Sequence, residues 1–264
     1  MKKILTFIII AFIAITAARA QTISAADLDK IIKNPNVVVV CRKSAEYLKT
    51  HVSGAINIDV DGLNNSTPVE GTLKSTADLS SIFGQRGLST SKEIIVYCKT
   101  GVNAGRMYWV LKYLGCSNVK MLDGQMDGWF AARKAITKNP TTLAATTFTA
   151  SVNSKLKVDK AYVKSKLTDS KVVLVDTRKK VDYDIGHIGN AVNIPHENLL
   201  SGTKIKTVAA LTAIFNGAGA TNDKEIILYC KTSTTAGLAY FILSSLLNYT
   251  NVKVYDGAYL EWSK

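Results

Sequence analysis

Buried-strand patterns alternate along the chain with segments that have the apolar spacing of helices. Apolar, β-branched runs in the first half predict strands at 36–41, 93–98 and 118–122. Apolar residues at helical spacing predict helices at 24–33, 75–84 and 102–115, before and between these strands. Ser24 is the expected N-cap of the first helix. This alternation predicts an α/β fold, with a parallel sheet covered by helices on both faces.

The second half repeats this order. "EYLKTHVSGAINID" (46–59) matches "DYDIGHIGNAVNIP" (182–195), and Cys98 and Cys230 stand 132 residues apart. Further strands are expected at 171–176, 224–230 and 251–255, with a helix at 235–247. We therefore predict two domains of about 115 residues, at 21–138 and 153–264, joined by a Thr- and Ala-rich linker at 139–152.

The first twenty residues have the pattern of a secretory signal. Lys2 and Lys3 precede an apolar run at 4–17 that only threonines interrupt, and Ala18 and Ala20 form an A-x-A cleavage site. We expect cleavage before Gln21, a periplasmic or secreted protein, and no stable membrane insertion afterwards. An uncleaved N-terminal anchor is the alternative, although the run is shorter than the roughly 20 residues of a bilayer span.

Composition limits the classes of partner. Without the predicted signal, 30 basic residues face 20 acidic ones, but the lysines are scattered and aromatic residues are not interleaved with them, so nucleic-acid binding is not expected. The four cysteines form no C-x-x-C pair, and the three histidines lie in no carboxylate cluster. The sequence therefore predicts neither a metal site nor a thioredoxin motif.

A cysteine stands between a buried strand and a helix in each half, in "VYCKTGVNAGR" (96–106) and "LYCKTSTTAGL" (228–238). Loop N–H groups and a helix N-terminus favour negative charge, so we expect lowered thiol pKa values and nucleophilic thiolates at Cys98 and Cys230. The predicted anion-binding loops comprise Lys99, Thr100, Gly101, Val102, Asn103 and Ala104 in the first copy, and Lys231, Thr232, Ser233, Thr234, Thr235 and Ala236 in the second. A buried structural cysteine is the alternative in each copy.

The stretch "VLVDTRKKVDYDIGHIGNAVNIP" (173–195), followed by the strand–Cys–loop–helix device and "NVKVYDG" (251–257), resembles the rhodanese sulfurtransferase family. The resemblance covers both halves and is closest to the tandem members, which include thiosulfate and mercaptopyruvate sulfurtransferases. It implies two rhodanese-like domains and a cysteine that takes a sulfane sulfur from a small anionic donor, becomes a persulfide, and passes the sulfur to a thiol or cyanide. No cofactor is expected, because the cysteine itself carries the sulfur.

Both copies depart from the family pattern. Family loops often read Cys-x-x-Gly-Val-Thr, and Ser233 replaces that glycine in the second copy, where a positive φ would strain it. The family's strand-end Asp-x-Arg is present as Asp176 and Arg178, whereas the first copy reads Val40-Cys41-Arg42, which places Val40 at the aspartate position. Loop chemistry favours Cys98, and the usual place of the family's active cysteine in the C-terminal unit favours Cys230. Both remain candidates.

Two other side chains carry specific expectations. Cys41 ends a strand that should neighbour the strand of Cys98, so it could relay a Cys98 persulfide or close a reversible disulfide with it. The alternative is a small residue in the place of Thr177. Arg106 is expected on the outward face of its helix, with Arg42 and Arg178 as the better supports for the loops.

Two other functions compete with sulfur transfer by an enzyme. A tyrosine-phosphatase loop needs an arginine six residues after the cysteine, and alanine stands there at 104 and 236, which argues against phosphate-ester hydrolysis. A non-enzymatic rhodanese-like sulfur carrier, binding or sensing module remains the alternative to an enzyme. Thiosulfate is the donor expected from the basic loops, mercaptopyruvate stays open, and we expect a monomer.

Overall fold

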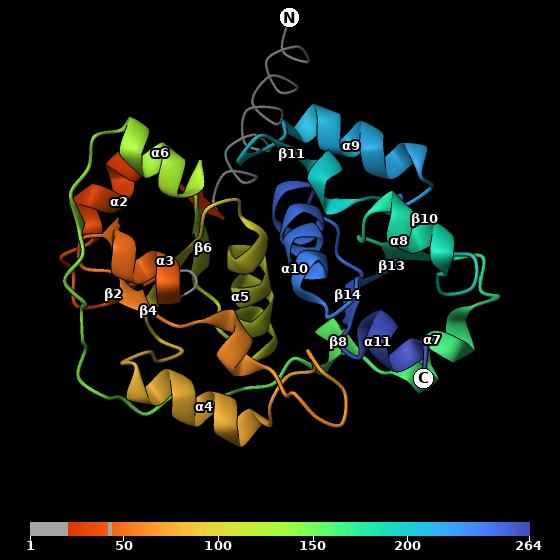
Figure 1. Ribbon diagram of the computed structural model, residues 1–264, viewed down its shortest axis with the longest axis horizontal. Helices are drawn as coiled ribbons and strands as arrows, with labels where there is room; N and C mark the ends of the chain where they lie inside the picture. The colour runs from red at the N-terminus through yellow and green to blue at the C-terminus, as the bar shows by residue number, and fades with distance from the viewer. Residues whose placement is uncertain (1–20, 42–43) are drawn as a thin grey trace, which may run out of the picture.

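The computed structural model describes residues 21–41 and 44–264, with the side chain of Cys41 left outside the description. The predicted signal segment, 1–20, and Arg42 lie outside the described residues. Two similar units follow one another along the chain, and Figure 1 shows them as two lobes. Elements β1 to β7 form what we call the first unit, and elements η2 to α11 form the second.

The first unit contains a five-stranded parallel sheet in the order β1-β6-β5-β2-β4. Its elements are β1 (Thr22–Ile23), α2 (Ala25–Ile31), β2 (Val37–Cys41), α3 (Ser44–Lys49), β3 (His51–Val52), β4 (Ile56–Asn57), η1 (Val60–Leu63), α4 (Thr76–Gln85), β5 (Glu93–Tyr97), α5 (Val102–Tyr113), β6 (Val119–Leu122), α6 (Gln125–Ala131) and β7 (Ile136–Thr137). Ser24 and Ser75 cap α2 and α4 through their side-chain oxygens, as the sequence predicts for Ser24.

The second unit repeats this topology in the order β10-β9-β13-β14-β8, again with parallel pairing throughout. Its elements are η2 (Ser154–Leu156), β8 (Lys157–Val158), α7 (Lys160–Lys166), β9 (Val172–Asp176), α8 (Lys180–Ile185), β10 (Val192–Asn193), η3 (His196–Leu199), β11 (Leu200–Ser201), β12 (Lys204–Ile205), α9 (Val208–Gly217), β13 (Glu225–Tyr229), α10 (Thr234–Phe241), the π-helical η4 (Ile242–Leu246), β14 (Val252–Tyr255) and α11 (Ala258–Trp262). The predicted fold class, two parallel sheets covered by helices, is confirmed.

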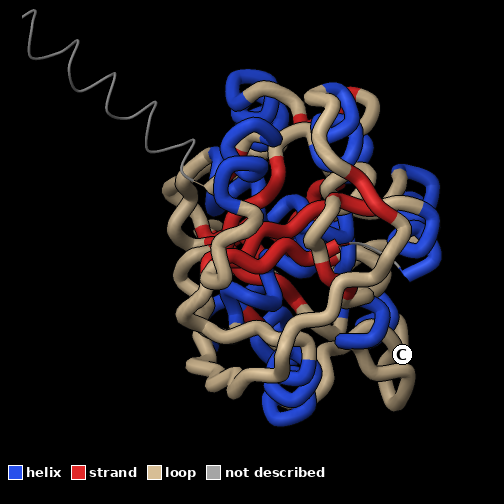
Figure 2. Tube along the Cα trace, turned by 90° about the vertical axis from the view of Figure 1, so that its left-hand side faces the viewer, coloured by secondary structure: helices blue, strands red, loops and turns tan. Residues whose placement is uncertain are grey.

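Alternating strand residues build three apolar layers. Val38, Val40 and Val96 of the first sheet belong to a large cluster that continues through α5 and α10 into the second unit. Val39 and Tyr97 face the opposite side, where α2, α3 and α6 cover the sheet, and a third cluster lies on the outer face of the second sheet. Figure 2 shows the strands inside and the helices and loops around them.

Helices α5 and α10 lie side by side at the centre of the molecule and hold the two units together (Figure 1). Their closest approach is at Gly105 and Gly237. A Cβ on Gly105 would lie 2.5 Å from the Cα of Leu238, and one on Gly237 would lie 2.6 Å from the Cα of Arg106. Only glycine allows this backbone contact, which brings the beginnings of both helices, and therefore both cysteine loops, to the junction of the units.

The segment 138–153 contains neither helix nor strand and runs along the first unit. Thr146 N donates to the carbonyl of Gly84, and Ser151 N donates to the carbonyl of Leu114. The segment is thus ordered and extended, although the predicted domain limits themselves remain a prediction. Within the described part of the chain, no helix has both the length and the apolar character needed to cross a membrane.

Candidate active site

The first cysteine loop joins β5 to α5. Cys98 follows the strand directly, and Gly101 adopts a left-handed conformation (φ +90°) just before the helix begins at Val102. The Gly101 N–H donates to Cys98 Sγ at 3.1 Å. The predicted arrangement of strand, cysteine, tight loop and helix is therefore present, with backbone N–H groups turned toward the sulfur.

Gln125 supports this loop, and the sequence reasoning missed it. Cys98 N donates to Gln125 Oε1 at 2.9 Å, and Gln125 Nε2 donates to the carbonyl of Leu122. Met126 N donates to the Cys98 carbonyl at 3.1 Å. In the sequence, the role of Gln125 was indicated only by its position directly after the Asp-Gly pair that both copies share. The second copy has Ala258 at that position.

The electrostatic effect on Cys98 is the reverse of the expectation. Complete burial raises the pKa of the Cys98 thiol, and this outweighs the lowering by hydrogen bonds from the backbone of Ala104, Thr100, Gly101 and Asn103. The cavity that Asn103 and Ala104 line has a volume of about 10 Å³, room for about one water at most. Cys98 thus has the predicted cradle, but its thiol pKa is raised rather than lowered.

The second cysteine loop joins β13 to α10 and has the same backbone shape despite its serine. Ser233 is left-handed (φ +62°, ψ 8°), in the place of Gly101. Its buried Oγ donates to the carbonyl of Tyr255 at 2.6 Å and approaches that of Asp256 at 3.3 Å. A left-handed residue with a side chain costs about 1–2 kcal/mol, and a buried hydrogen bond returns about 1 kcal/mol. Ser233 is therefore in the strained conformation that we expected, and the hydrogen bond of its hydroxyl offsets much of the free-energy cost.

Cys230 opens onto a pocket. The pocket has a volume of about 220 Å³ and is lined by Arg178, Lys179, Asp182, His196, Cys230, Lys231, Thr232, Thr234 and Thr235. Three of these residues are cationic and one is a carboxylate, so the lining favours an anion. Cys98 and Cys230 are almost equally buried, at 3% and 4% exposed.

Asp176 and Arg178 form a buried lock beside this pocket. Arg178 Nε donates to both carboxylate oxygens of Asp176 (3.0 and 2.9 Å), and Nη2 donates to Asp176 Oδ2 and to the carbonyl of Gly186 (2.5 and 2.6 Å). The guanidinium also lies 3.7 Å from the ring centroid of Tyr259, whose N–H donates to the Cys230 carbonyl. The predicted supporting pair is thus placed within contact of the Cys230 loop.

Strand register corrects the predicted alignment of the two copies. In the first sheet Cys41 pairs with Tyr97, and in the second Asp176 pairs with Tyr229. Cys41, rather than Val40, therefore occupies the aspartate position. The side chain of Cys41 is outside the description, while Cys98, Cys116 and Cys230 are free thiols. The proposed link between Cys41 and Cys98 remains a prediction.

A family model of the rhodanese-like domain matches this chain twice, at residues 24–132 and 159–264. The chain belongs to the rhodanese family. Each match contains four of the five strands of one parallel sheet and one cysteine loop, so the repeat found in the sequence is a repeat of this domain.

This tandem rhodanese is similar to sulfurtransferases over most of its length. It is 29% identical to the 3-mercaptopyruvate sulfurtransferase of Escherichia coli, with 82% of each chain covered. It is 31% identical to a putative thiosulfate sulfurtransferase of Synechococcus elongatus, covering 82% of this chain and 74% of the relative. The crystal structure of SseA from Escherichia coli, a 3-mercaptopyruvate sulfotransferase by its description, matches with a TM-score of 0.84 and 27% identity, over 90% of this chain and 98% of that one.

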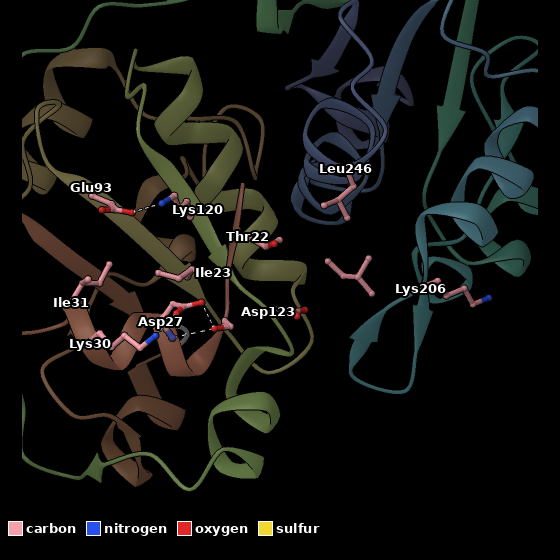
Figure 3. Close-up of a pocket in the computed structure, with 12 residues that line it drawn as sticks. Thr22, Ile23, Asp27, Lys30, Ile31, Glu93, Lys120, Asp123, Lys206 and Leu246 are labelled. Atoms are coloured by element: carbon pink, nitrogen blue, oxygen red, sulfur yellow. Dashed lines mark hydrogen bonds and ion pairs between the residues drawn. The ribbon is translucent and has the colours of Figure 1, made fainter. Parts of the chain in front are cut away.

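A cavity of this rhodanese that is larger than the Cys230 pocket contains neither cysteine. It has a volume of about 790 Å³ and lies between α2 and β6 of the first unit and β12 and η4 of the second, as Figure 3 shows. Four of its charged side chains are paired, Lys30 with Asp27 at 2.8 Å and Lys120 with Glu93 at 2.7 Å. None of the predicted site residues lines it, so volume alone does not mark the site.

The remaining predicted residues are divided between the copies. Lys99 and Lys231 are both exposed, and Lys231 lines the Cys230 pocket. Thr235 Oγ1 lies 2.7 Å from Thr177 Oγ1, which ties the second loop to the end of β9. Among the side chains that the structure describes, no three His, Cys, Asp or Glu residues gather as metal ligands would.

Proposed function

We propose that this rhodanese transfers a sulfane sulfur from thiosulfate, through a persulfide on Cys230, to a thiol or to cyanide. The observation that carries the proposal is the pocket of about 220 Å³, which Cys230, Lys179 and Lys231 line together. The family and the sulfurtransferase relatives support the reaction class.

The proposed reaction has two displacements. The Cys230 thiolate attacks the outer sulfur of thiosulfate, the S–S bond of the donor breaks, and sulfite leaves with the electron pair. A thiolate or cyanide then attacks the outer sulfur of the persulfide, and Cys230 leaves as a thiolate. Each step exchanges one bond to sulfur for another, so no outside oxidant or reductant is needed.

The loop would stabilise the charged states of both steps. The loop from Lys231 runs into the beginning of α10, where helix geometry favours an anion, so its backbone N–H groups would stabilise a thiolate or persulfide on Cys230. Lys179 and Lys231 are exposed at the mouth of the pocket and would attract an anionic donor before it docks. These are the roles that we assign to the second loop.

The arrangement of Arg178 favours thiosulfate over mercaptopyruvate as the donor. A planar carboxylate is bound best by the two parallel N–H groups of a free guanidinium. Arg178 already uses Nε and Nη2 on Asp176 and Gly186. Threonine hydroxyls and lysine ammonium groups remain, and they suit the three oxygens of a tetrahedral sulfonate. Mercaptopyruvate is the second candidate, because relatives of both types are similar to this chain.

Steady-state assays with each donor test the proposal. We expect thiocyanate from thiosulfate and cyanide, loss of at least about a thousandfold in Cys230→Ser, and most of the activity retained in Cys98→Ser. Loss in Cys98→Ser with activity kept in Cys230→Ser would reverse the assignment. Activity with mercaptopyruvate alone would change the donor. No turnover with either donor, together with a persulfide acquired only from a protein partner, would indicate the carrier function instead.

The place of action is also a proposal. The signal pattern of 1–20 supports export to the periplasm or beyond. Fractionation of cells that express the full chain, with N-terminal sequencing of the product, tests this. A mature N-terminus at Gln21 is the expected result.

A further inference from the structure

Arg106 is a buried cation at the junction of the two units, and not the outward-facing residue that the sequence predicts. It belongs to α5 and is completely buried. Its Nη2 donates to Asn64 Oδ1 at 2.9 Å, to the carbonyl of Gly71 at 3.0 Å and to Asp256 Oδ1 at 3.2 Å. The first two partners are in the first unit, and Asp256 is in the second.

Burying Arg106 with these partners contributes little net free energy to the stability of the fold. Nε and Nη1 of Arg106 are buried without a hydrogen-bond partner, and the guanidinium lies 4.7 Å from the ring centroid of Trp109. Unsatisfied buried donors cost free energy, and well-packed apolar residues often replace a buried ion pair without loss of stability. The geometry that the pair imposes is therefore the better explanation for its presence.

Asp256 connects Arg106 with the Cys230 loop. Its Oδ1 binds Arg106, and its Oδ2 accepts from Leu73 N at 3.0 Å. Ser233, the left-handed residue of the loop, donates its hydroxyl to the carbonyl of Tyr255 and also approaches the carbonyl of Asp256. One carboxylate thus joins the first unit to the backbone that holds Ser233.

The segment 64–73 of the first unit also touches the loop directly. A Cβ on Gly71 would lie 2.6 Å from the Cβ of Thr232, so only a glycine fits against that side chain. Thr232 lines the Cys230 pocket on one side and a second pocket of about 320 Å³, formed with the segment 61–71, on the other. The position of Gly71, which Arg106 holds through its carbonyl, therefore limits where Thr232 can lie.

We propose that Arg106 and Asp256 are positioning residues for the reaction at Cys230, an inference that rests on the proposed function. The first unit, through this pair, holds the loop of the second unit in the shape that presents its N–H groups to the sulfur. A loop displaced by about 1 Å can lose on the order of a hundredfold in rate. The first unit would therefore contribute to the reaction at Cys230 even if Cys98 itself carries no sulfur.

The test separates positioning from stability. The variants are Arg106→Met, Asp256→Leu and the double variant, which replaces a buried ion pair by apolar side chains. Melting temperature and the single-turnover rate of sulfur loading on Cys230, followed as a mass gain of one sulfur atom, are measured for each. We expect a lower melting temperature in both single variants. The double variant should regain most of the wild-type melting temperature, while its Cys230 takes up sulfur about 10- to 100-fold more slowly than in the wild type.

Tyr108→Phe is the matched control. Tyr108 lies on the same helix and accepts a hydrogen bond from Ser245 of the second unit at 2.9 Å, in an inter-unit contact that does not include the Cys230 loop. It should lower the melting temperature without slowing the loading. Asp256→Asn serves as a milder variant if a single apolar substitution does not fold, and it should slow loading with a smaller loss of melting temperature than Asp256→Leu, because the amide oxygen can still accept from Arg106.

The outcomes are distinct. A double variant that regains its melting temperature and loads at the wild-type rate would show that the pair is merely structural, and it would overturn the inference while leaving the proposed function intact. A wild-type chain that acquires no sulfur on Cys230 from either donor would overturn the proposed function and the inference with it. Slower loading in Tyr108→Phe, to the extent seen in the double variant, would also contradict a specific role of the pair.

Discussion

The two cysteine loops have nearly the same backbone and different surroundings. Both follow a buried strand, both turn through a left-handed residue, and both accept an N–H onto the cysteine carbonyl from the helix after the next strand. The first loop is held by Gln125, whose side chain accepts from Cys98 N, whereas the second is held by Ser233 and lies beside a cationic pocket and the buried Asp176–Arg178 pair. The backbone shape is therefore shared by the copies, and the side chains that hold it differ.

The largest expected effect follows from breaking the Asp176–Arg178 lock of the second copy. Asp176→Ala leaves the Arg178 guanidinium buried without its carboxylate, which should cost about 3–5 kcal/mol of unfolding free energy. Chemical denaturation measures this loss. Lys180→Ala, which breaks the exposed Lys180–Asp184 pair, is the control and should cost less than about 1 kcal/mol. Equal losses in the two variants would contradict the importance of burial.

The serine–glycine difference gives the next effect. Ser233→Ala keeps the left-handed strain and removes the donor to the Tyr255 carbonyl, so we expect a loss of about 1–3 kcal/mol. Ser233→Gly removes both the strain and the donor and should be close to neutral. The reciprocal Gly101→Ser should cost about 1–2 kcal/mol. Unchanged stability in Ser233→Ala would mean that the hydroxyl does not hold the loop.

Alkylation compares the two sulfurs directly. Because burial raises the pKa of Cys98, its thiolate fraction at pH 7.5 is below that of an ordinary thiol, and the fraction grows only as the pH rises above the usual thiol range. Cys230 has an open pocket next to it. We expect iodoacetamide to modify Cys230 at least about tenfold faster than Cys98 at pH 7.5, as measured by peptide mass spectrometry, with the ratio falling as the pH increases toward 10. A ratio that does not depend on pH would argue against a raised pKa at Cys98.

The smallest effect concerns the exposed lysines. Lys231→Gln should raise the KM for thiosulfate by about two- to fivefold, and the change should shrink with added salt, because an exposed charge is worth less than about 1 kcal/mol. Lys99→Gln changes the charge by the same amount next to the other cysteine. An equal rise in KM for both variants would indicate a general attraction of anions rather than a role at the Cys230 pocket.

Sequence patterns predicted the sheets, the repeat and both loops because these depend on periodicity and on neighbours along the chain. The inter-unit contacts could not be read in the same way, since Arg106 and Asp256 are 150 residues apart. One signal was nevertheless present. The repeat aligns Arg106 with Leu238, which is buried, so an inward position was readable from the second copy. The Val40 alignment failed by one residue because only strand register, and not residue similarity, fixes which positions correspond.

The glycine contact between α5 and α10 has a consequence for how the molecule unfolds. Each helix is packed on its own sheet and also on the other helix, with backbones close enough that one added methyl group would force them apart. Neither unit can then melt without exposing an apolar face of the other, so the energy of the interface is shared by both. We therefore expect the two similar halves to unfold as one cooperative unit, and a half expressed alone would be left with an uncovered helix.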